Sequence, residues 1–452
     1  MKLTSLSIVL IGAAVALSSC TTERALRSEK AQLADDVRQE FLHSWNAYKK
    51  YAWGHDMLRP VSKTPVDIYT RSLLLTPVDA MDTMILMGLK EEADATREYV
   101  VTHLSFDQDI YVKNFEITIR LLGGLLSSYQ LTGDERLLKL ADDLGTRLLP
   151  VFKSPTGMPY VEVNLRTGAV RGTRTNPAEV GTLLVEFGTL SKLTGKPEYY
   201  AAAKNAALQI FKRRSPIGLV GTWIDCTTGQ WLDTDSHVSA CIDSYYEYLL
   251  KCSILFDDKD LKDAWDVSKI AVMKYLADEA PSGLWIGHAD MITGKRTHTW
   301  FGALDAFFPA VLALSGDVAN GRRLEESCFK MWNKYGIEPD NFDYIKMDTL
   351  DPRYALNPEI MESAYYLYHY TNDQRYIEMG KTFLRNLEQR CRMDEGYSHL
   401  KNVATGQRSD LMESYFLAET LKYLYLLFAP QETLEFDKVV FNTEAHPIRK
   451  TW

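Results

Sequence analysis

Apolar and amphipathic stretches alternate along most of the chain. One repeat unit occurs at residues 129–141, 191–203 and 368–380. In each copy an apolar stretch ends at a Gly, Asn or Asp, and an amphipathic stretch follows. Weaker copies begin at Met87, Leu255 and Leu314. Each copy is typical of two helices joined at a C-terminal stop. The stops recur roughly every 45 to 62 residues, at or beyond the long end of known solenoid periods.

This repeat predicts an all-α protein built from helical hairpins. The first helix of each repeat unit is apolar almost all round, as in residues 121–131 and 183–193, and the second carries a polar face. This difference is expected if the first helices form an inner wall and the second helices form an outer wall that faces solvent. Residues 412–428 supply a seventh apolar helix, so we predict an (α/α)7 barrel, with an open helical array as the alternative.

A short strand-like segment follows the seventh apolar helix, where its outer partner is expected. Val439–Phe441 is β-branched and aromatic, and polar residues and a proline flank it. A lone strand needs hydrogen-bond partners. We therefore predict a C-terminal β-hairpin that plugs one end of the barrel and delivers Thr443 and Glu444 to its interior. A hairpin on the surface is the alternative.

Acidic residues interrupt or open the apolar helices. They are Asp82, Glu116, Glu179, Asp243, Glu247, Asp305, Glu359, Glu362, Glu413 and Glu419. Most lie early in their helices, so a barrel would gather them at one mouth. Carboxylates are costly to bury unpaired, which argues for a site, although a helix N-terminus also favours an acid. Such a ring can supply the acid and base that flank a glycosidic bond and can hold a hard cation through water, with Thr443 as an oxygen ligand.

Composition and charge narrow the class of partner. The 452 residues are 46% hydrophobic and 25% charged, which is typical of a globular protein with a large core. The net charge of -9 argues against a nucleic-acid or anionic-membrane surface and suits a cation or a neutral ligand.

The N-terminus is typical of a bacterial lipoprotein signal. Lys2 precedes an apolar run over residues 6–17, and Leu17-Ser-Ser-Cys20 follows. We expect a signal peptide over 1–19, a tether over 20–35 and one catalytic domain over 36–452. The mature chain would be lipid-anchored through Cys20 in the bacterial cell envelope, in the periplasm or at the outer membrane. An ordinary secretory signal is the alternative. The five other cysteines are an odd set without metal-ligand spacing.

Several blocks together resemble the class I α-mannosidases, glycoside hydrolase family 47, and the likeness runs from Tyr48 to Pro447. The blocks are residues 48–56, 78–89, 114–126, 243–251, 357–363, the helix that starts at Met412, and Phe441-Asn-Thr-Glu-Ala-His-Pro447. The resemblance implies a bacterial member of the family, a calcium-dependent, inverting, exo-acting α-1,2-mannosidase on an (α/α)7 barrel. Its partner would be an α-mannoside or a mannose-containing oligosaccharide such as an N-glycan-like chain, and we expect a monomer.

The resemblance also implies roles for particular residues. Thr443 would hold the calcium ion, Glu116 would be the general acid and Glu359 the general base, while Asp243 would either orient groups or share the acid work. Inversion requires the two carboxyl groups to stand about 6.5–9.5 Å apart. The expected sugar contacts or partners of calcium-bound water are Arg120, Glu179, Glu362, Tyr415, Glu413, Glu419 and Glu444.

The chain departs from the family pattern at two places. Asn357 stands where the family usually has Arg, which should change the neighbouring sugar that is accepted. Residues 303–307 lack a His and a Cys common in eukaryotic members, so the family's disulfide is absent or altered, and Asp305 is a candidate replacement for a sugar contact. Further candidates for stacking on a sugar face are Tyr415, Phe416, Trp223, Trp285 and Trp300. We interpret His288, His298 and His446 as structural.

Two other functions stay open on the sequence alone. A sugar epimerase on an (α/α) barrel would need a pair of histidines for proton transfer, and no such pair lies on the apolar helices. A glycan-binding lipoprotein with an inactive site is disfavoured by the joint presence of Glu116, Asp243, Glu359 and Thr443.

Overall fold

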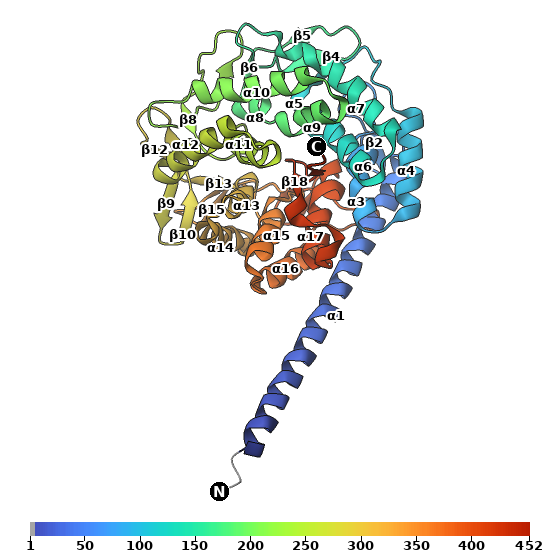
Figure 1. The fold of residues 1–452 in the computed structure, drawn as a ribbon, viewed down its shortest axis with the longest axis vertical. Helices are drawn as coiled ribbons and strands as arrows, with labels where there is room; N and C mark the ends of the chain where they lie inside the picture. Colours follow the sequence, from blue (N-terminus) through green and yellow to red (C-terminus); the bar gives the residue numbers. More distant parts are fainter. Residues whose placement is uncertain (1–4) are drawn as a thin grey trace.

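The computed structural model describes the backbone of residues 5–452 and the side chains from residue 28 onward. Helical hairpins form a closed ring, as Figure 1 shows. The inner wall consists of α2–α3 (Leu75–Asp79, Met81–Leu86), α5–α6 (Asn114–Ile117, Gly123–Thr132), α8–α9 (Pro177–Gly181, Leu184–Thr194), α11 (Asp243–Phe256), α13 (Phe308–Leu314), α15 (Glu359–Thr371) and α17 (Leu421–Phe428). The outer helices are α4 (Lys90–His103), α7 (Glu135–Leu148), α10 (Pro197–Lys212), α12 (Lys259–Tyr275), α14 (Val318–Tyr335), α16 (Arg375–Arg390) and α1 (Ser5–Tyr51). The predicted (α/α)7 barrel is confirmed.

The seventh hairpin joins the two ends of the chain. Its inner helix α17 packs against α1, so the first helix supplies the outer partner that the sequence after residue 428 lacks. Arg38 of α1 donates from Nε to the carbonyl of Met87 and from Nη2 to Tyr425 of α17. The ring is therefore closed by a contact between segments almost 400 residues apart, which a local repeat cannot reveal.

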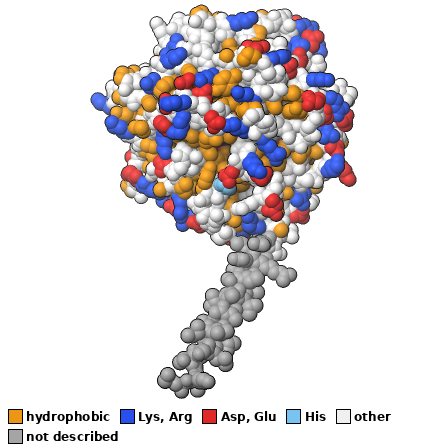
Figure 2. Space-filling model, viewed as in Figure 1, with side chains coloured by type: hydrophobic (Ala, Val, Ile, Leu, Met, Phe, Trp, Pro, Cys, Tyr) orange, Lys and Arg blue, Asp and Glu red, His pale blue; other side chains and the backbone are white. Residues whose placement is uncertain are grey.

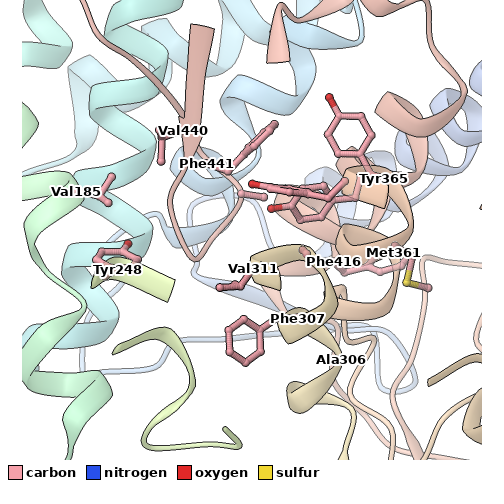
Figure 3. Close-up of a cluster of buried hydrophobic side chains, with 14 of the residues drawn as sticks. Val185, Tyr248, Ala306, Phe307, Val311, Met361, Tyr365, Phe416, Val440 and Phe441 are labelled. Atoms are coloured by element: carbon pink, nitrogen blue, oxygen red, sulfur yellow. The ribbon is translucent and has the colours of Figure 1, made fainter. Parts of the chain in front are cut away.

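The C-terminal hairpin lies inside the ring, as predicted. β18 (Val439–Phe441) pairs antiparallel with β19 (Pro447–Arg449), and Figure 1 shows β18 at the centre of the barrel. Figure 3 shows Val440 and Phe441 among the side chains of Val185, Tyr248 and Tyr365 from three inner helices. Burial of these apolar side chains fixes the hairpin in the axis.

Asn442 holds the turn of this hairpin. Its Oδ1 accepts hydrogen bonds from the backbone N–H groups of Glu444 and His446, and its Nδ2 donates to the carbonyl of Ile119 and to Glu186. The inner wall approaches closely here, because a Cβ on Gly123 would lie 2.5 Å from Asn442 Nδ2. Only glycine leaves room for this contact, which sets the depth of Thr443 and Glu444 in the barrel.

Short antiparallel sheets connect outer helices to the next inner helices. These two- and three-stranded sheets are β1–β2 (Met57–Arg59, Thr64–Val66), β3–β4–β5 (Tyr111–Lys113, Glu162–Asn164, Val170–Arg171), β6–β7 (Arg174–Thr175, Ile224–Asp225), β8–β11–β12 (Asp235–Ser236, His288–Asp290, Arg296–His298), β9–β10 (Ala277–Ala280, Gly283–Ile286), β13–β14–β15 (Trp300–Gly302, Asn341–Asp343, Asp348–Asp351) and β16–β17 (Leu400–Asn402, Gln407–Arg408).

Four turns beside these sheets share the pattern Asp/Asn-x-x-Thr-Gly, and they begin at Asn164, Asp225, Asp290 and Asn402. In each turn the first side chain accepts hydrogen bonds from backbone N–H groups two and three residues later. The glycine has a positive φ of 68° to 74°. This pattern is a turn signal with a clear physical cause.

The expected N-terminal processing stays a prediction. Cys20 lies outside the residues whose side chains are described. Within the predicted tether, Glu29 already pairs with Lys381, and Lys30 donates to the hydroxyl of Tyr368. In the described part of the chain no helix is long and apolar enough to cross a membrane. Figure 2 shows acidic and basic side chains interspersed on the face it presents.

One predicted member of the carboxylate ring belongs to the core. Asp82 is fully buried and pairs with Lys422 at 2.8 Å and with His446 at 2.7 Å. Burial alone would raise the pKa of Asp82, but the charges of Lys422 and His446 outweigh it and lower the pKa to about 2. Asp82 is therefore a structural anion, and its placement at the mouth is wrong.

We expect Asp82→Asn to destabilise the fold by roughly 3–5 kcal/mol at neutral pH, because it leaves Lys422 buried without its anion. The depressed pKa gives stability above about pH 4 that is lost as the pH falls toward 2. The cost of the substitution should therefore shrink in acid. Urea unfolding at pH 7 and at pH 3 measures both effects. Asp94→Asn, whose side chain pairs with Lys90 on the surface of α4, is the control and should leave stability nearly unchanged at both pH values.

Two buried acids in the wall have no hydrogen-bond partner in the described part of the chain. Glu325 of α14 and Glu338 are both 0% exposed, and none of their four carboxyl oxygens has a hydrogen-bond partner among the described residues. Burial raises the pKa of both carboxyl groups well above the usual range, and for Glu338 the charges of Glu359 and Glu325 add to this effect. Both groups are therefore held neutral.

Replacement of Glu325 should stabilise the protein. The folded state keeps the carboxyl protonated, while the unfolded state ionises above about pH 4.5, so wild-type stability falls as the pH rises above that value. Glu325→Met removes this loss. We expect the free energy of unfolding to rise by about 1–3 kcal/mol at pH 7 and the difference from wild type to disappear near pH 4. The exposed neighbour gives the control, Glu326→Gln, which should not gain stability. Equal stability of Glu325→Met and wild type in urea at pH 7 would contradict the assignment.

Candidate active site

A cavity of about 320 Å3 opens at one mouth of the barrel. The predicted site residues that line it are Glu116, Arg120, Glu179, Asp243, Glu359, Tyr415, Glu419, Thr443 and Glu444. These residues come from five inner segments and from the hairpin, which the ring brings together. An outer cleft of about 910 Å3 adjoins this cavity and shares Glu116, Arg120 and Tyr415 with it.

Four other predicted acids lie elsewhere. Glu413 lines the outer cleft. Glu362 is buried and lies 3.6 Å from Lys251, which also pairs with Glu247 deeper in the barrel. Asp305 is 1% exposed, accepts a hydrogen bond from the backbone N–H of Gly302 and lines neither cavity. Fewer acids therefore line the mouth of the barrel than predicted, and Asp305 does not replace a sugar contact.

Arg120 organises the acids on one side of the cavity. Its Nε donates to Glu116 at 3.1 Å, and its Nη1 donates to Glu444 at 3.1 Å. Glu116 and Arg120 are four residues apart, and Arg120 lies in a π-helical segment, Thr118–Leu122, that joins α5 to α6. A second π-helical segment, Phe416–Thr420, carries Glu419. Such widened turns often mark functional sites.

The opposite side holds Asp243 and Glu359 at the starts of α11 and α15. The backbone N–H of Ser244 donates to Asp243 at 2.8 Å. Burial, followed by the charges of Glu247 and Asp305, raises the pKa of Asp243 to about 7. Burial also raises the pKa of Glu359 well above its usual range, and one of its carboxyl oxygens has no partner among the described groups.

Negative charge exceeds positive charge around the hairpin tip. Burial raises the pKa values of Glu419 and Glu444. The charges of Glu444 and Glu359 add to this effect for Glu419, and those of Asp79 and Glu116 add to it for Glu444. Arg120 is the only cationic side chain that lines the inner cavity in the described part of the chain. Thr443 projects from the hairpin into this excess of acid, so the cavity favours a bound cation.

Asn357 leaves the cavity without a second long cation. Its side chain is 5% exposed, and its Oδ1 accepts a hydrogen bond from the backbone N–H of Ala355 at 3.2 Å. Next to it, Tyr415 lines both cavities and donates from its hydroxyl to the carbonyl of Ala355. The cavity wall beside Glu359 therefore carries a short side chain, Asn357, and a tyrosine, Tyr415, that hydrogen bonds to Ala355 hold in place.

The other aromatic candidates divide into two groups. Phe416 and Trp285 are fully buried in the core, where Trp285 stacks on Tyr344, so the prediction that they face sugar is wrong. Trp223 is half-buried, and the guanidinium of Arg174 lies 4.0 Å from its ring centre. Trp300 is 36% exposed and stacks on His298 at 3.8 Å.

A cluster of Asp235, His237 and His288 brings three potential metal ligands within 4.8 Å of one another. Ser239 N–H donates to Nδ1 of His237, so Nε2 carries the proton that faces Thr222, and no free lone pair remains on that ring. The two imidazoles stack at 4.4 Å, while His288 pairs with Asp235. Nitrogen ligands also suit calcium poorly. The cluster is thus a hydrogen-bonded network beside the site.

His446 is structural, as interpreted from the sequence. It is fully buried and lies between Asp79 and Asp82, whose charges raise its pKa to about 9 although burial opposes them. Sequence reasoning missed Asp79, Glu186 and Asn442, the groups that hold the hairpin tip. Asn442 lies in the block Phe441-Asn-Thr-Glu-Ala-His-Pro447, and its position beside Thr443 is the available signal.

An acid-lined pocket at the mouth of an (α/α) barrel, closed at its inner end by a hairpin, suits a glycoside hydrolase. The family model for glycosyl hydrolase family 47 matches residues 40–450. The chain belongs to this family.

Named relatives agree with this assignment. The chain is 34% identical to alpha-mannosidase I MNS5 of Arabidopsis thaliana, over 93% of this chain and 78% of that protein. It is 35% identical to human ER degradation-enhancing alpha-mannosidase-like protein 2, with the same two coverages. The solved structure of alpha-1,2-mannosidase from Trichoderma reesei superposes with a TM-score of 0.85 at 30% identity, over 93% of this chain and 99% of that one. A cellobiose 2-epimerase with 12% identity and a TM-score of 0.56 shares the fold alone.

Proposed function

We propose that the protein is an exo-acting α-1,2-mannosidase that inverts the anomeric configuration. This proposal rests mainly on the shape of the inner cavity, which is open at the mouth of the barrel and blind at its inner end. Glu116 and Glu359 lie on different walls of it, and the hairpin tip blocks its inner end. A blind pocket accepts only the end of a glycan chain, which favours removal of a terminal sugar. The names of the mannosidase relatives support mannose as that sugar.

In this proposal Glu116 protonates the leaving oxygen and Glu359 takes a proton from the attacking water. Glu116 lies at the border between the inner cavity and the outer cleft, where the leaving group would emerge. Glu359 is more deeply enclosed. Asp243, with a pKa of about 7, is able to hold or release a proton near neutral pH and assists the acid. Tyr415 and Arg120 bind hydroxyls or restrain Glu116.

Calcium fits the inner end of the cavity. The groups around Thr443 offer oxygen atoms, and the acids outnumber Arg120, as a hard cation requires. Thr443 would hold the ion through its hydroxyl and carbonyl, and Glu419 and Glu444 would bind its water. The ion, when bound, would supply positive charge that orients sugar hydroxyls and favours the ionised form of the nearby Glu359.

The outer cleft would hold the rest of the substrate, a mannoside or an N-glycan-like oligosaccharide. Tyr69, Tyr111 and the Arg171–Glu162 pair line it, and such mixtures of aromatic faces and oriented polar groups suit sugars. We further propose a bacterial, monomeric protein that is lipid-anchored at the cell envelope through Cys20. Mass spectrometry of the membrane fraction for a lipidated Cys20 tests that location.

Linkage preference tests the proposed activity. The protein should release mannose from α-1,2-linked mannobiose at least about tenfold faster than from the α-1,3 and α-1,6 isomers. Product quantification by chromatography measures this ratio. Epimerisation without hydrolysis, or binding of mannobiose without turnover, would contradict the proposal.

A further inference from the structure

The turn before α11, residues 239–242, forms part of the wall of the inner cavity. Ala240 and Cys241 line the cavity, and Asp243, which also lines it, follows directly as the first residue of α11. The carbonyl of Ser239 accepts a hydrogen bond from the backbone N–H of Asp243 at 3.0 Å. The position of Ser239 therefore sets the point at which α11 begins and at which Asp243 enters the cavity.

The backbone of this turn is strained. Cys241 has a φ of 80°, a left-handed conformation that is uncommon for any residue other than glycine. Its carbonyl accepts a hydrogen bond from the backbone N–H of Ala178 at 2.8 Å, and Ala178 belongs to α8, next to Glu179. A strained conformation persists only where the surrounding contacts hold it. The turn therefore depends on its anchors, and α8 is one of them.

His237 is the second anchor. Its Nδ1 accepts a hydrogen bond from the backbone N–H of Ser239 at 3.1 Å. On the other side of the ring, Nε2 lies 3.0 Å from the hydroxyl oxygen of Thr222, which donates its own proton to the carbonyl of Asp235. Burial lowers the pKa of His237 well below its usual value, so the ring is neutral. One tautomer therefore satisfies both ring nitrogens, and it leaves Nδ1 as the acceptor for Ser239.

The network behind His237 keeps its ring in this position. The imidazole is buried and stacks on that of His288, with 4.4 Å between the ring centres. Nδ1 of His288 lies 2.7 Å from one carboxylate oxygen of Asp235, and Thr297 donates to the other oxygen at 2.6 Å. These residues belong to β8, β11 and β12 and lie outside both cavities. The network therefore reaches the site through the turn before α11.

We propose that His237 is a positioning residue for Asp243. This inference rests on the proposed function, in which Asp243 assists the acid Glu116. His237 holds Ser239, and Ser239 holds the first N–H of α11, so this chain of hydrogen bonds fixes where the carboxyl group of Asp243 stands. A misplacement of about 1 Å can cost roughly 10²-fold in rate. His237 itself touches neither the substrate nor the reacting atoms.

Two substrates separate this role from a general loss of folded protein. α-1,2-Mannobiose has a leaving oxygen that must be protonated, whereas α-mannosyl fluoride releases fluoride, which needs little help from an acid. His237→Leu keeps the volume of the side chain roughly unchanged but removes the acceptor for the N–H of Ser239. We expect it to lower kcat for mannobiose about tenfold, to change KM less than about twofold, and to lower kcat for the fluoride less than about twofold.

His237→Asn tests the hydrogen bond itself. The side-chain oxygen of asparagine accepts a hydrogen bond from the backbone N–H two residues later, as Asn164 and Asn402 do in this protein, so it can replace Nδ1 toward Ser239. We expect this variant to recover most of the rate on mannobiose. His237→Leu combined with Asp243→Asn should be slower than Asp243→Asn alone by less than about twofold, because both changes act through the same carboxyl group.

Thr222→Val gives a second, milder route to the same test. It removes the partner of Nε2 at nearly constant volume, and it should show the same dependence on substrate as His237→Leu, more weakly. His103→Gln, on the exposed face of α4, is the matched control and should behave as wild type on both substrates.

Four results would overturn the inference and leave the proposed function intact. They are equal losses on mannobiose and on the fluoride, wild-type rates for His237→Leu, no recovery with His237→Asn, and additive losses in the double variant. A wild-type protein that hydrolyses neither substrate would overturn the proposed function and this inference with it.

Discussion

Glu359→Gln should abolish hydrolysis, with kcat reduced about 10³-fold, while binding of mannobiose is retained. The amide has nearly the shape of the carboxyl group but cannot take a proton from water, and general base catalysis typically contributes about 10²–10⁴-fold. Glu359 is the group at the start of α15, and one of its carboxyl oxygens has no partner among the described residues, so this oxygen is available to a water molecule. Initial rates and a calorimetric binding isotherm measure the two effects.

The matched control for this substitution is Glu378→Gln on the exposed face of α16. It makes the same chemical change outside both cavities and should leave kcat within about twofold. Wild-type turnover by Glu359→Gln would show that another group is the base. Loss of binding together with turnover would assign Glu359 to substrate binding instead.

Removal of divalent cations should have the second largest effect. We expect chelation to lower activity at least about 100-fold, calcium to restore it, and magnesium to restore little, because magnesium demands a smaller octahedral site. Thr443→Val should raise the calcium concentration required for half-maximal activity. Activity assays with metal analysis of the chelated protein test this.

The identity of the restoring metal separates two sites in the structure. Restoration by calcium supports the oxygen-rich end of the cavity around Thr443. Restoration by zinc but not by calcium would indicate the cluster of Asp235, His237 and His288 and would contradict our interpretation of that cluster as a hydrogen-bonded network. Full activity in verified metal-free protein would exclude the cation from the reaction.

The barrel could be predicted because its signal is local and repeated. Each hairpin shows an apolar helix, a stop and an amphipathic helix, and Val439–Phe441 is a strand in a place where only the axis offers enough apolar surface. The closure by α1 against α17 could not be predicted in this way. It depends on a contact across nearly the whole chain, and the sequence of α1 contains no copy of the repeat.

The candidate site could likewise be predicted only in part from the sequence. Glu116, Asp243 and Glu359 were found because acids at the starts of apolar helices are rare and costly. The same reasoning misplaced Asp82, since a buried cation, Lys422, compensates it and comes from another helix. Pairing in three dimensions decides whether a buried acid is structural or functional.

Side-chain direction limited the prediction of aromatic contacts. Phe416 directly follows Tyr415, yet Tyr415 faces the cavities and Phe416 faces the core, because successive residues of a helix point in different directions. A widened π-helical turn begins at Phe416 and shifts the helical phase there, so helical periodicity cannot be read reliably through this segment.

The most direct test of the inverting mechanism is the configuration of the mannose that appears first. Proton NMR of α-1,2-mannobiose hydrolysis in real time resolves the two anomers before they equilibrate. The account predicts β-mannose as the first product of the wild-type protein with calcium, and none with Glu359→Gln. If α-mannose appeared first, the enzyme would retain configuration, and Glu116 and Glu359 would not be an acid and a base separated by water.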